Sequence, residues 1–148
     1  MSNSKVQNGD VLLNITGASI GRCHFITNNL DEANVNQHVC IIRPKSEIST
    51  KLLFYILRSN IGQEQINQEQ TGSGREGLNF ESLKNFIALS FDMDEQTAIV
   101  THIEKETARI DAKIEKTNKL IALQKEYRTA LISEVVTGKI KITNENES

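Results

Sequence analysis

The stretch DMDEQTAIVTHIEKETARIDAKIEKTNKLIALQKEYRTALISEVV, residues 92–136, contains neither proline nor glycine. Its apolar residues recur at steps of three, four and seven, which places them in one stripe along a helix. We expect pairing through this stripe, at Ile99, Ile103, Ile110, Ile114, Ile121, Leu131 and Val135. A helix of roughly 42 residues would be about 63 Å long, which exceeds the width of a small domain. We therefore expect it to protrude and to pair with another helix, another copy or another subunit.

Polar residues interrupt this stripe at several seam positions. They are Thr107, Thr117, Gln124 and Arg128. Polar seam residues lower the stability of a coiled coil and fix its register. The pattern therefore favours a specific antiparallel pairing over a permissive leucine zipper. The basic residues between 105 and 119 alternate with acidic ones, which is typical of a solvated helix face.

Both ends of the helix carry recognisable signals. Asp92 and Glu95 have the spacing of a capping box. Gly138 suits the left-handed conformation that ends a helix. We therefore divide the chain into a domain over residues 1–91, a long helix over residues 92–138 and a polar tail over residues 139–148.

Residues 1–91 mix strand-like and helix-like patterns, which predicts an α+β fold. After a turn signal at Gly9 and Asp10, strands are expected over residues 11–16, 22–27, 35–43 and 86–91, the first two as a hairpin. Helical segments are expected over residues 51–59, 62–69 and 78–85, with a glycine-rich loop over residues 71–77. About four short strands with unpaired edges indicate either a very small sheet or a larger domain that lacks its beginning.

The composition argues against several classes of protein. The 148 residues carry a net charge of −2 from 17 basic and 19 acidic side chains, so there is no overall basic footprint. No apolar run approaches the roughly 20 residues of a membrane span, and the N-terminal residues show no signal pattern. We expect a cytoplasmic protein without membrane association. Cys23 and Cys40 lie in apolar runs outside any metal-binding pattern, so we expect buried, reduced thiols, no metal and no cofactor.

One catalytic motif is present in the chain. Residues 17–21, GASIG, match the GxSxG string of hydrolases, with Ser19 as the nucleophile. That nucleophile must follow a strand and open a helix, whereas residues 22–27 are predicted to form a strand. The chain also has no GxxxxGKS/T phosphate-binding loop. We therefore expect a protein that is not an enzyme.

Four weak motifs, in a consistent order, carry a resemblance to a known family. They are GDVLLNITGASIGR at residues 9–22, NVNQHVCIIRP at 34–44, the run LLFYILRSNIGQEQ to NFIALSF at 52–91, and DEQTAIVTHIEKETARIDAKI at 94–114 with LQKEYRTALISEVVTGKI at 123–140. Over about residues 8–142 the chain resembles the specificity subunits of type I restriction-modification enzymes. One departure is the segment Leu89-Ser90-Phe91-Asp92-Met93-Asp94, which stands where the family has a proline-rich sequence.

The resemblance implies a non-catalytic component that reads double-stranded DNA within a restriction system. It implies that the helix spaces two half-sites and docks the methylation subunits, which together with the restriction subunits carry the catalysis. A family member normally has two target-recognition domains and two spacer helices. This chain resembles the later part of one recognition domain and one helix, as in a C-terminal fragment or a split half-subunit. We therefore also expect self-association, or pairing with another specificity half, through the helix.

Candidate DNA contacts are the side chains that can pair with base edges or phosphates. They are Thr16, Ser19 and Arg22 around the first turn, Asn36, Gln37 and His38 before the third strand, and Ser73 and Arg75 in the glycine-rich loop. Each has a plainer interpretation: a solvated arginine, a half-buried histidine or a simple flexible connector. The alternative function is a helical interaction or structural protein that does not bind DNA.

Overall fold

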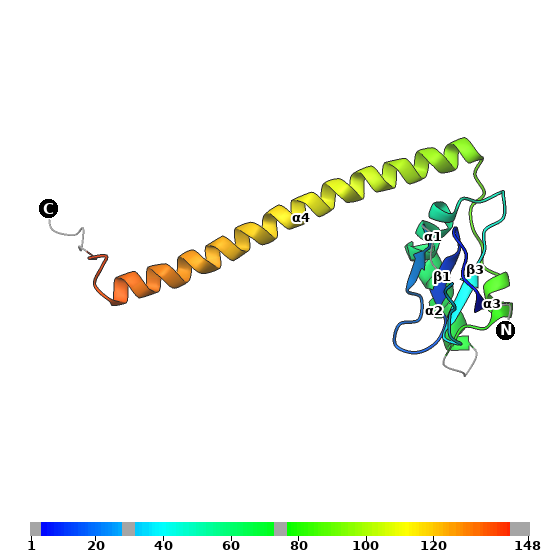
Figure 1. The fold of residues 1–148 in the computed structure, drawn as a ribbon, viewed down its shortest axis with the longest axis horizontal. Helices are drawn as coiled ribbons and strands as arrows, with labels where there is room; N and C mark the ends of the chain where they lie inside the picture. Colours follow the sequence, from blue (N-terminus) through cyan, green and yellow to red (C-terminus); the bar gives the residue numbers. More distant parts are fainter. Residues whose placement is uncertain (1–3, 28–31, 73–76, 143–148) are drawn as a thin grey trace. The chain divides into compact units, whose positions relative to one another are not determined.

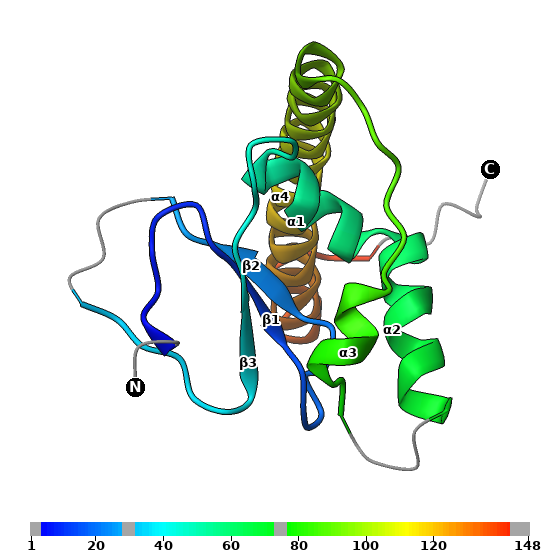
Figure 2. The same cartoon turned by 90° about the vertical axis from the view of Figure 1, so that its right-hand side faces the viewer.

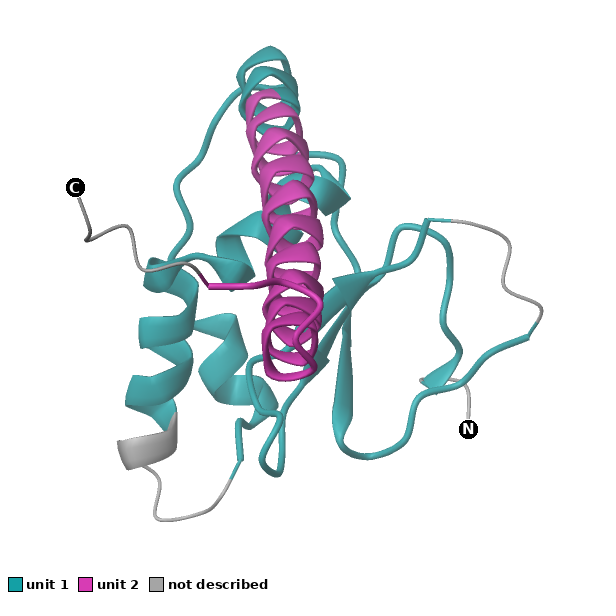
Figure 3. Cartoon of the chain, turned by 90° about the vertical axis from the view of Figure 1, so that its left-hand side faces the viewer, with its two compact units in different colours: residues 1–101 teal, residues 102–148 magenta. Residues whose placement is uncertain are grey.

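The computed structural model describes residues 4–27, 32–72 and 77–142, and it has the expected α+β fold. Its elements are β1 (Val11–Asn14), β2 (Cys23–Phe25), β3 (Val39–Ile42), α1 (Thr50–Arg58), α2 (Asn60–Gly72), α3 (Phe80–Lys84) and α4 (Met93–Val136), labelled in Figure 1. The chain divides into two compact units, residues 1–101 and residues 102–148, coloured separately in Figure 3. The first unit holds the sheet, three helices and the first turns of α4. The second holds the rest of α4.

The sheet is antiparallel with the strand order β2-β1-β3, and β1 and β2 form the expected hairpin. Alternation along β1 sends Val11 and Leu13 to one face, where both are fully buried. Leu12 pairs with His24 on β2 and with Ile41 on β3, and these residues belong to the other face. Figure 2 shows α1, α2 and α3 on one side of the sheet. Within the described part of the first unit, the helices therefore pack against one face of the sheet.

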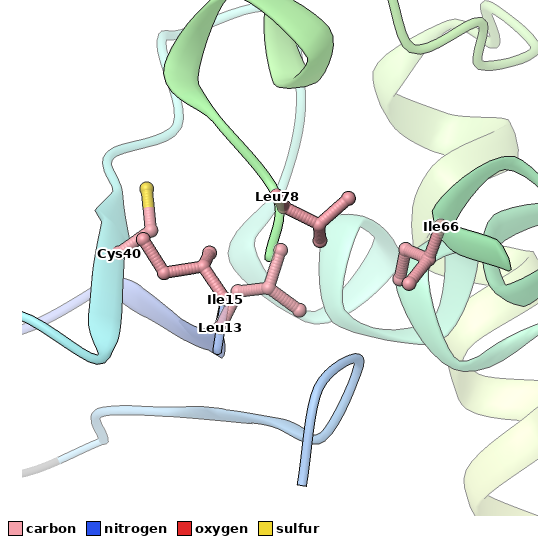
Figure 4. Close-up of a cluster of buried hydrophobic side chains, with 5 residues drawn as sticks. All are labelled: Leu13, Ile15, Cys40, Ile66 and Leu78. Atoms are coloured by element: carbon pink, nitrogen blue, oxygen red, sulfur yellow. The ribbon is translucent and has the colours of Figure 1, made fainter. Parts of the chain in front are cut away.

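The core lies between the sheet and the helices. Figure 4 shows its five buried side chains, Leu13, Ile15, Cys40, Ile66 and Leu78, which come from β1, the residue after it, β3, α2 and the segment before α3. Cys40 is buried and Cys23 half-buried, and both are free thiols whose pKa is raised by burial. The expectation of buried, reduced cysteines is therefore confirmed for Cys40 and holds in part for Cys23.

The Gly9-Asp10 turn has a structural role that the sequence did not reveal. The Asp10 carboxylate is fully buried and accepts hydrogen bonds from Arg43 Nε (2.7 Å), Arg43 Nη2 (2.8 Å) and the backbone N–H of Gln7 (2.6 Å). Burial raises the pKa of this carboxyl, but the hydrogen bonds from Arg43 and Gln7 outweigh burial and hold the pKa below its ordinary 3.8. Asp10 thus joins the start of β1 to the residue that follows β3.

The predicted strand over residues 86–91 is wrong, because the structure has irregular backbone there. The Gln65 side chain on α2 takes the place of a strand partner: its Oε1 accepts the Ile87 amide at 2.7 Å and its Nε2 donates to the Ile87 carbonyl at 3.0 Å. Ile87 and Leu89 are consequently exposed rather than packed in a sheet. The described residues form one sheet of three strands rather than about four strands.

The other elements agree with the expectations but differ in length. The third strand spans four residues instead of nine, because the Asn36 side chain accepts the His38 amide at 3.1 Å and turns the backbone away from the ladder. The helix expected over residues 62–69 is longer, since α2 runs to Gly72. Ser49 caps α1, with its hydroxyl accepting the Leu52 backbone amide at 3.2 Å.

Both predicted ends of the long helix are confirmed. The Asp92 carboxylate accepts the Glu95 amide at 2.8 Å at the start of α4. After Val136, Gly138 has φ = 75°, and its amide donates to Val135 while that of Ile140 donates to Glu134. The helix contains 44 residues. No helix in the described ranges is long and apolar enough to cross a membrane.

A buried glutamine ties the start of α4 to the rest of the first unit. The Gln96 side chain is 2% exposed. Its Oε1 accepts the Ser49 amide at 2.8 Å, and its Nε2 donates to the carbonyls of Glu47 (2.8 Å) and Phe91 (3.0 Å). The side chain thus satisfies three backbone groups near the N-terminus of α1 and before α4.

Gly62 allows α2 to pack closely on the end of α1. A Cβ added there would overlap the Ile56 carbonyl oxygen and lie 2.8 Å from the Leu57 carbonyl oxygen. Because both obstacles are backbone atoms, Gly62→Ala is expected to lower the free energy of unfolding by about 1–3 kcal/mol. A urea titration measures this, with Glu64→Ala on the exposed face of α2 as the control. An unchanged stability of Gly62→Ala would contradict the close packing.

Candidate nucleic-acid interface

Four of the predicted DNA-contact residues lie together at one end of the sheet. Thr16 follows β1, while Asn36, Gln37 and His38 precede β3, and the Ile15 amide donates to the His38 carbonyl at 2.9 Å. Thr16 Oγ1 is 2.5 Å from His38 Nδ1, and Gln37 Nε2 is 3.3 Å from His38 Nε2. We call this group, Thr16 with Asn36, Gln37 and His38, the polar rim.

Both ring nitrogens of His38 have partners within the polar rim. If the Gln37 amide donates to Nε2, the proton of the neutral ring lies on Nδ1 and donates to the Thr16 hydroxyl. The side chains of Asn36, Gln37 and His38 are exposed, so the remaining donors and acceptors of this network face solvent. The polar rim can therefore present a fixed pattern of donors and acceptors to a ligand.

The turn at residues 17–21 has a structural role and does not form a nucleophile elbow. Gly17 and Gly21 have φ of 77° and 82°, and Ser19 Oγ accepts Asn14 Nδ2 at 2.8 Å. The strand β2 follows the turn, whereas the elbow must open a helix. Ser19 is thus placed as a hydrogen-bond partner of Asn14. Within the described part of the chain, no three His, Cys, Asp or Glu side chains gather where they could hold a metal ion.

The glycine-rich loop returns to the sheet beside the polar rim. The Leu78 amide donates to the Ile15 carbonyl at 2.8 Å, and a Cβ at Gly77 would lie 3.1 Å from Thr16 Cγ2. The candidates Ser73 and Arg75 lie outside the described residues. The end of the loop is therefore adjacent to Thr16, so three segments far apart in the sequence converge at one edge of the domain.

Arg22 lies on the face of the sheet that the helices leave open. It lines a shallow hollow of about 430 Å³ together with Leu12, Asn14, His24, Asn34 and Asn36. Sequence reasoning included Arg22 and Asn36 and missed Asn14, His24 and Asn34. A signal existed for two of them, since Asn14 and His24 are the polar residues of otherwise apolar strands.

The apolar stripe of α4 divides into two parts. Ile99 and Ile103, in the early turns of α4, are half-buried, and Val100 is buried. Four further stripe residues are exposed, namely Ile110, Ile114, Ile121 and Leu131, and Val135 is half-buried. Ion pairs Glu106–Arg109 (2.9 Å) and Glu115–Lys119 (2.6 Å) lie on the helix surface. The middle of the helix therefore offers apolar side chains that are uncovered in this chain.

A family model described as type I restriction modification DNA specificity domain matches residues 2–124. The chain belongs to this family. The match includes the sheet, the polar rim and the first part of α4, so the resemblance seen in the sequence motifs is confirmed. No curated protein matches the chain.

A solved structure supports the fold of this specificity-domain chain. It is described as concerning complex assembly and conformational transition of the type I R-M system. The likeness has a TM-score of 0.73 at 18% sequence identity and covers 88% of this chain and 31% of the other. This specificity domain therefore spans about a third of that chain's length. At this identity the likeness establishes the fold alone.

Proposed function

We propose that this specificity domain contributes DNA target recognition to a type I restriction-modification complex and takes no part in catalysis. The family match over residues 2–124 supports this role. The observation that carries it furthest is the convergence of the polar rim and the end of the glycine-rich loop at one edge of the sheet. Amide, hydroxyl and imidazole groups in a fixed network suit base edges, which present paired donors and acceptors.

The long helix serves assembly in this proposal. Its exposed stripe from Ile110 to Leu131 pairs with a second copy or with another specificity half. The helix also docks the methylation subunits. The spacing between two DNA half-sites then follows from the helix length, because a paired helix is rigid along its axis. The partners are double-stranded DNA and the methylation and restriction subunits of the same system.

A direct experiment separates DNA recognition from a purely structural role. The chain is co-purified with the methylation subunits of its system, and bound duplexes are selected from a random-sequence library and sequenced. Enrichment of one bipartite sequence supports the proposal. A complex that assembles but enriches no sequence would instead favour the alternative, a helical interaction protein that does not read DNA.

Within that complex, Gln37→Ala is expected to weaken binding to the selected target roughly tenfold, because a good contact to a base edge is worth about 1–3 kcal/mol. Binding to unrelated duplexes should change little, since base contacts carry the sequence information. The matched control is Gln7→Ala, an exposed glutamine at the opposite end of β1. Equal losses on target and unrelated duplexes would show that Gln37 is not a base reader.

A further inference from the structure

The shallow hollow on the open face of the sheet is also lined by residues 34–36. Residues 4–6 pair with residues 33–35 through the Lys5–Asn34 bridge and the bonds Val6 N–H to Ala33 O and Val35 N–H to Ser4 O, both 2.9 Å. Figure 2 shows these two segments on the side of the sheet away from α1, α2 and α3. Asn34, Val35 and Asn36 line the hollow together with Leu12, Arg22 and other residues of the sheet.

Two of the three amides that line this hollow, Asn34 and Asn36, present donors, while Asn14 donates to Ser19 Oγ at 2.8 Å. Asn34 Oδ1 accepts the Ser4 hydroxyl at 3.3 Å, and Asn36 Oδ1 accepts the His38 amide at 3.1 Å. Since both carbonyl oxygens are occupied, the NH₂ group of each side chain is left to donate. Neither NH₂ group donates a hydrogen bond to another described residue. A ligand that only accepts hydrogen bonds would match these groups.

The charge of the hollow has one sign. The Arg22 side chain is exposed and forms no ion pair with any described residue, unlike Arg43, Arg109 and Lys119. None of the described residues that line the hollow is acidic, and His24 is a second basic side chain there. An anion is therefore the complementary ligand.

We propose that this hollow binds a phosphodiester group of duplex DNA, with Arg22 as the charged contact and Asn34 and Asn36 as further donors. Phosphate oxygens only accept hydrogen bonds, and arginine with amide donors is a common way to hold them. The inference rests on the proposed function and deepens it. It assigns Arg22 to positioning the DNA backbone and leaves base reading to the polar rim, which lies at the end of the same sheet.

The test measures non-specific DNA binding, because a phosphate contact does not depend on sequence. The full chain is titrated onto fluorescein-labelled duplexes of several unrelated sequences, and anisotropy is followed from about 50 to about 200 mM salt. Arg22→Gln should weaken binding to every duplex by roughly three- to tenfold and reduce the salt slope by about one. Asn34→Asp keeps the acceptor for Ser4 but replaces the NH₂ donor with a carboxylate, so it should weaken binding by at least the same factor.

Two control variants make the same kinds of substitution at residues outside the hollow. Arg58→Gln lies in the last turn of α1, and Asn60→Asp lies at the start of α2; both side chains are exposed and neither lines the hollow. Both should bind as the unmodified chain does. If Arg22→Gln and Asn34→Asp leave affinity and salt slope unchanged while the unmodified chain binds DNA, the phosphate site is wrong and the proposed function stands. If the unmodified chain binds no duplex even at the lowest salt and enriches no sequence in its complex, both are wrong.

Discussion

The full chain carrying Ile110→Lys and Ile121→Lys is expected to sediment as a monomer at concentrations where the unmodified chain is paired. The two isoleucines are 49% and 46% exposed in this chain, so pairing would bury them against a partner helix. A lysine at either position places a charge in an apolar seam without a partner, which is costly to bury. Two such charges should weaken pairing about 100-fold or more.

Analytical ultracentrifugation over a range of concentrations measures this pairing. The control is Ala108→Lys with Ala112→Lys, which adds the same charge to the opposite, exposed face of α4 and should leave pairing intact. Circular dichroism should show the same helix content in all three chains. Sedimentation of the unmodified chain as a monomer at every concentration would rule out self-association and leave only pairing with a different chain.

Loss of the Asp10 carboxylate should clearly lower the stability of the first unit. Asp10→Ala removes the acceptor of the Gln7 backbone amide at a partly buried place and breaks both hydrogen bonds from Arg43. We expect the free energy of unfolding to fall by about 2–3 kcal/mol, a figure reduced because the half-exposed Arg43 can be hydrated. A urea titration measures the change. Lys5→Ala, which breaks the exposed ion pair to Glu32, serves as the control and should have little effect.

The same carboxylate makes stability depend on pH in a predictable direction. Because the folded chain holds the pKa of Asp10 below 3.8, the unfolded chain takes up the proton first as the pH falls. The stabilisation from Asp10 is thus complete above its ordinary pKa and is lost as the pH drops through the lower, folded value. Below about pH 4 the unmodified chain should lose stability more steeply than Asp10→Asn. Parallel curves for the two chains would contradict the role given to Asp10.

The long helix and its ends could be predicted from the sequence because the determinants are local. The absence of glycine and proline, the apolar spacing and the two cap residues each act within a few positions along the chain. The strands were located but predicted too long, since periodicity does not reveal that the Asn36 side chain delays the start of β3. The prediction for residues 86–91 was wrong for a related reason. This apolar run suits a strand, but the side chain of Gln65, 22 residues before Ile87, bonds the Ile87 backbone instead.

The candidate site could be predicted in segments but not in its arrangement. Thr16 and His38 were both chosen for their chemistry, while their 2.5 Å contact depends on the register of β1 against β3, which a single sequence does not fix. Asn34 lies outside every predicted strand and helix, and its position beside the hollow depends on pairing with residues near the N-terminus. Contacts between distant segments were thus the part that local patterns could not provide.

The Gln96 joint has a consequence for how such domains can diversify. Each of the three hydrogen bonds of the Gln96 side chain is made to a main-chain atom. These bonds therefore do not depend on which side chains stand at positions 47, 49 and 91. Substitutions in the segment before α1 can alter the surface of the first unit without breaking the attachment of α4. One amide side chain therefore lets the side chains at these positions vary while the same helix stays attached.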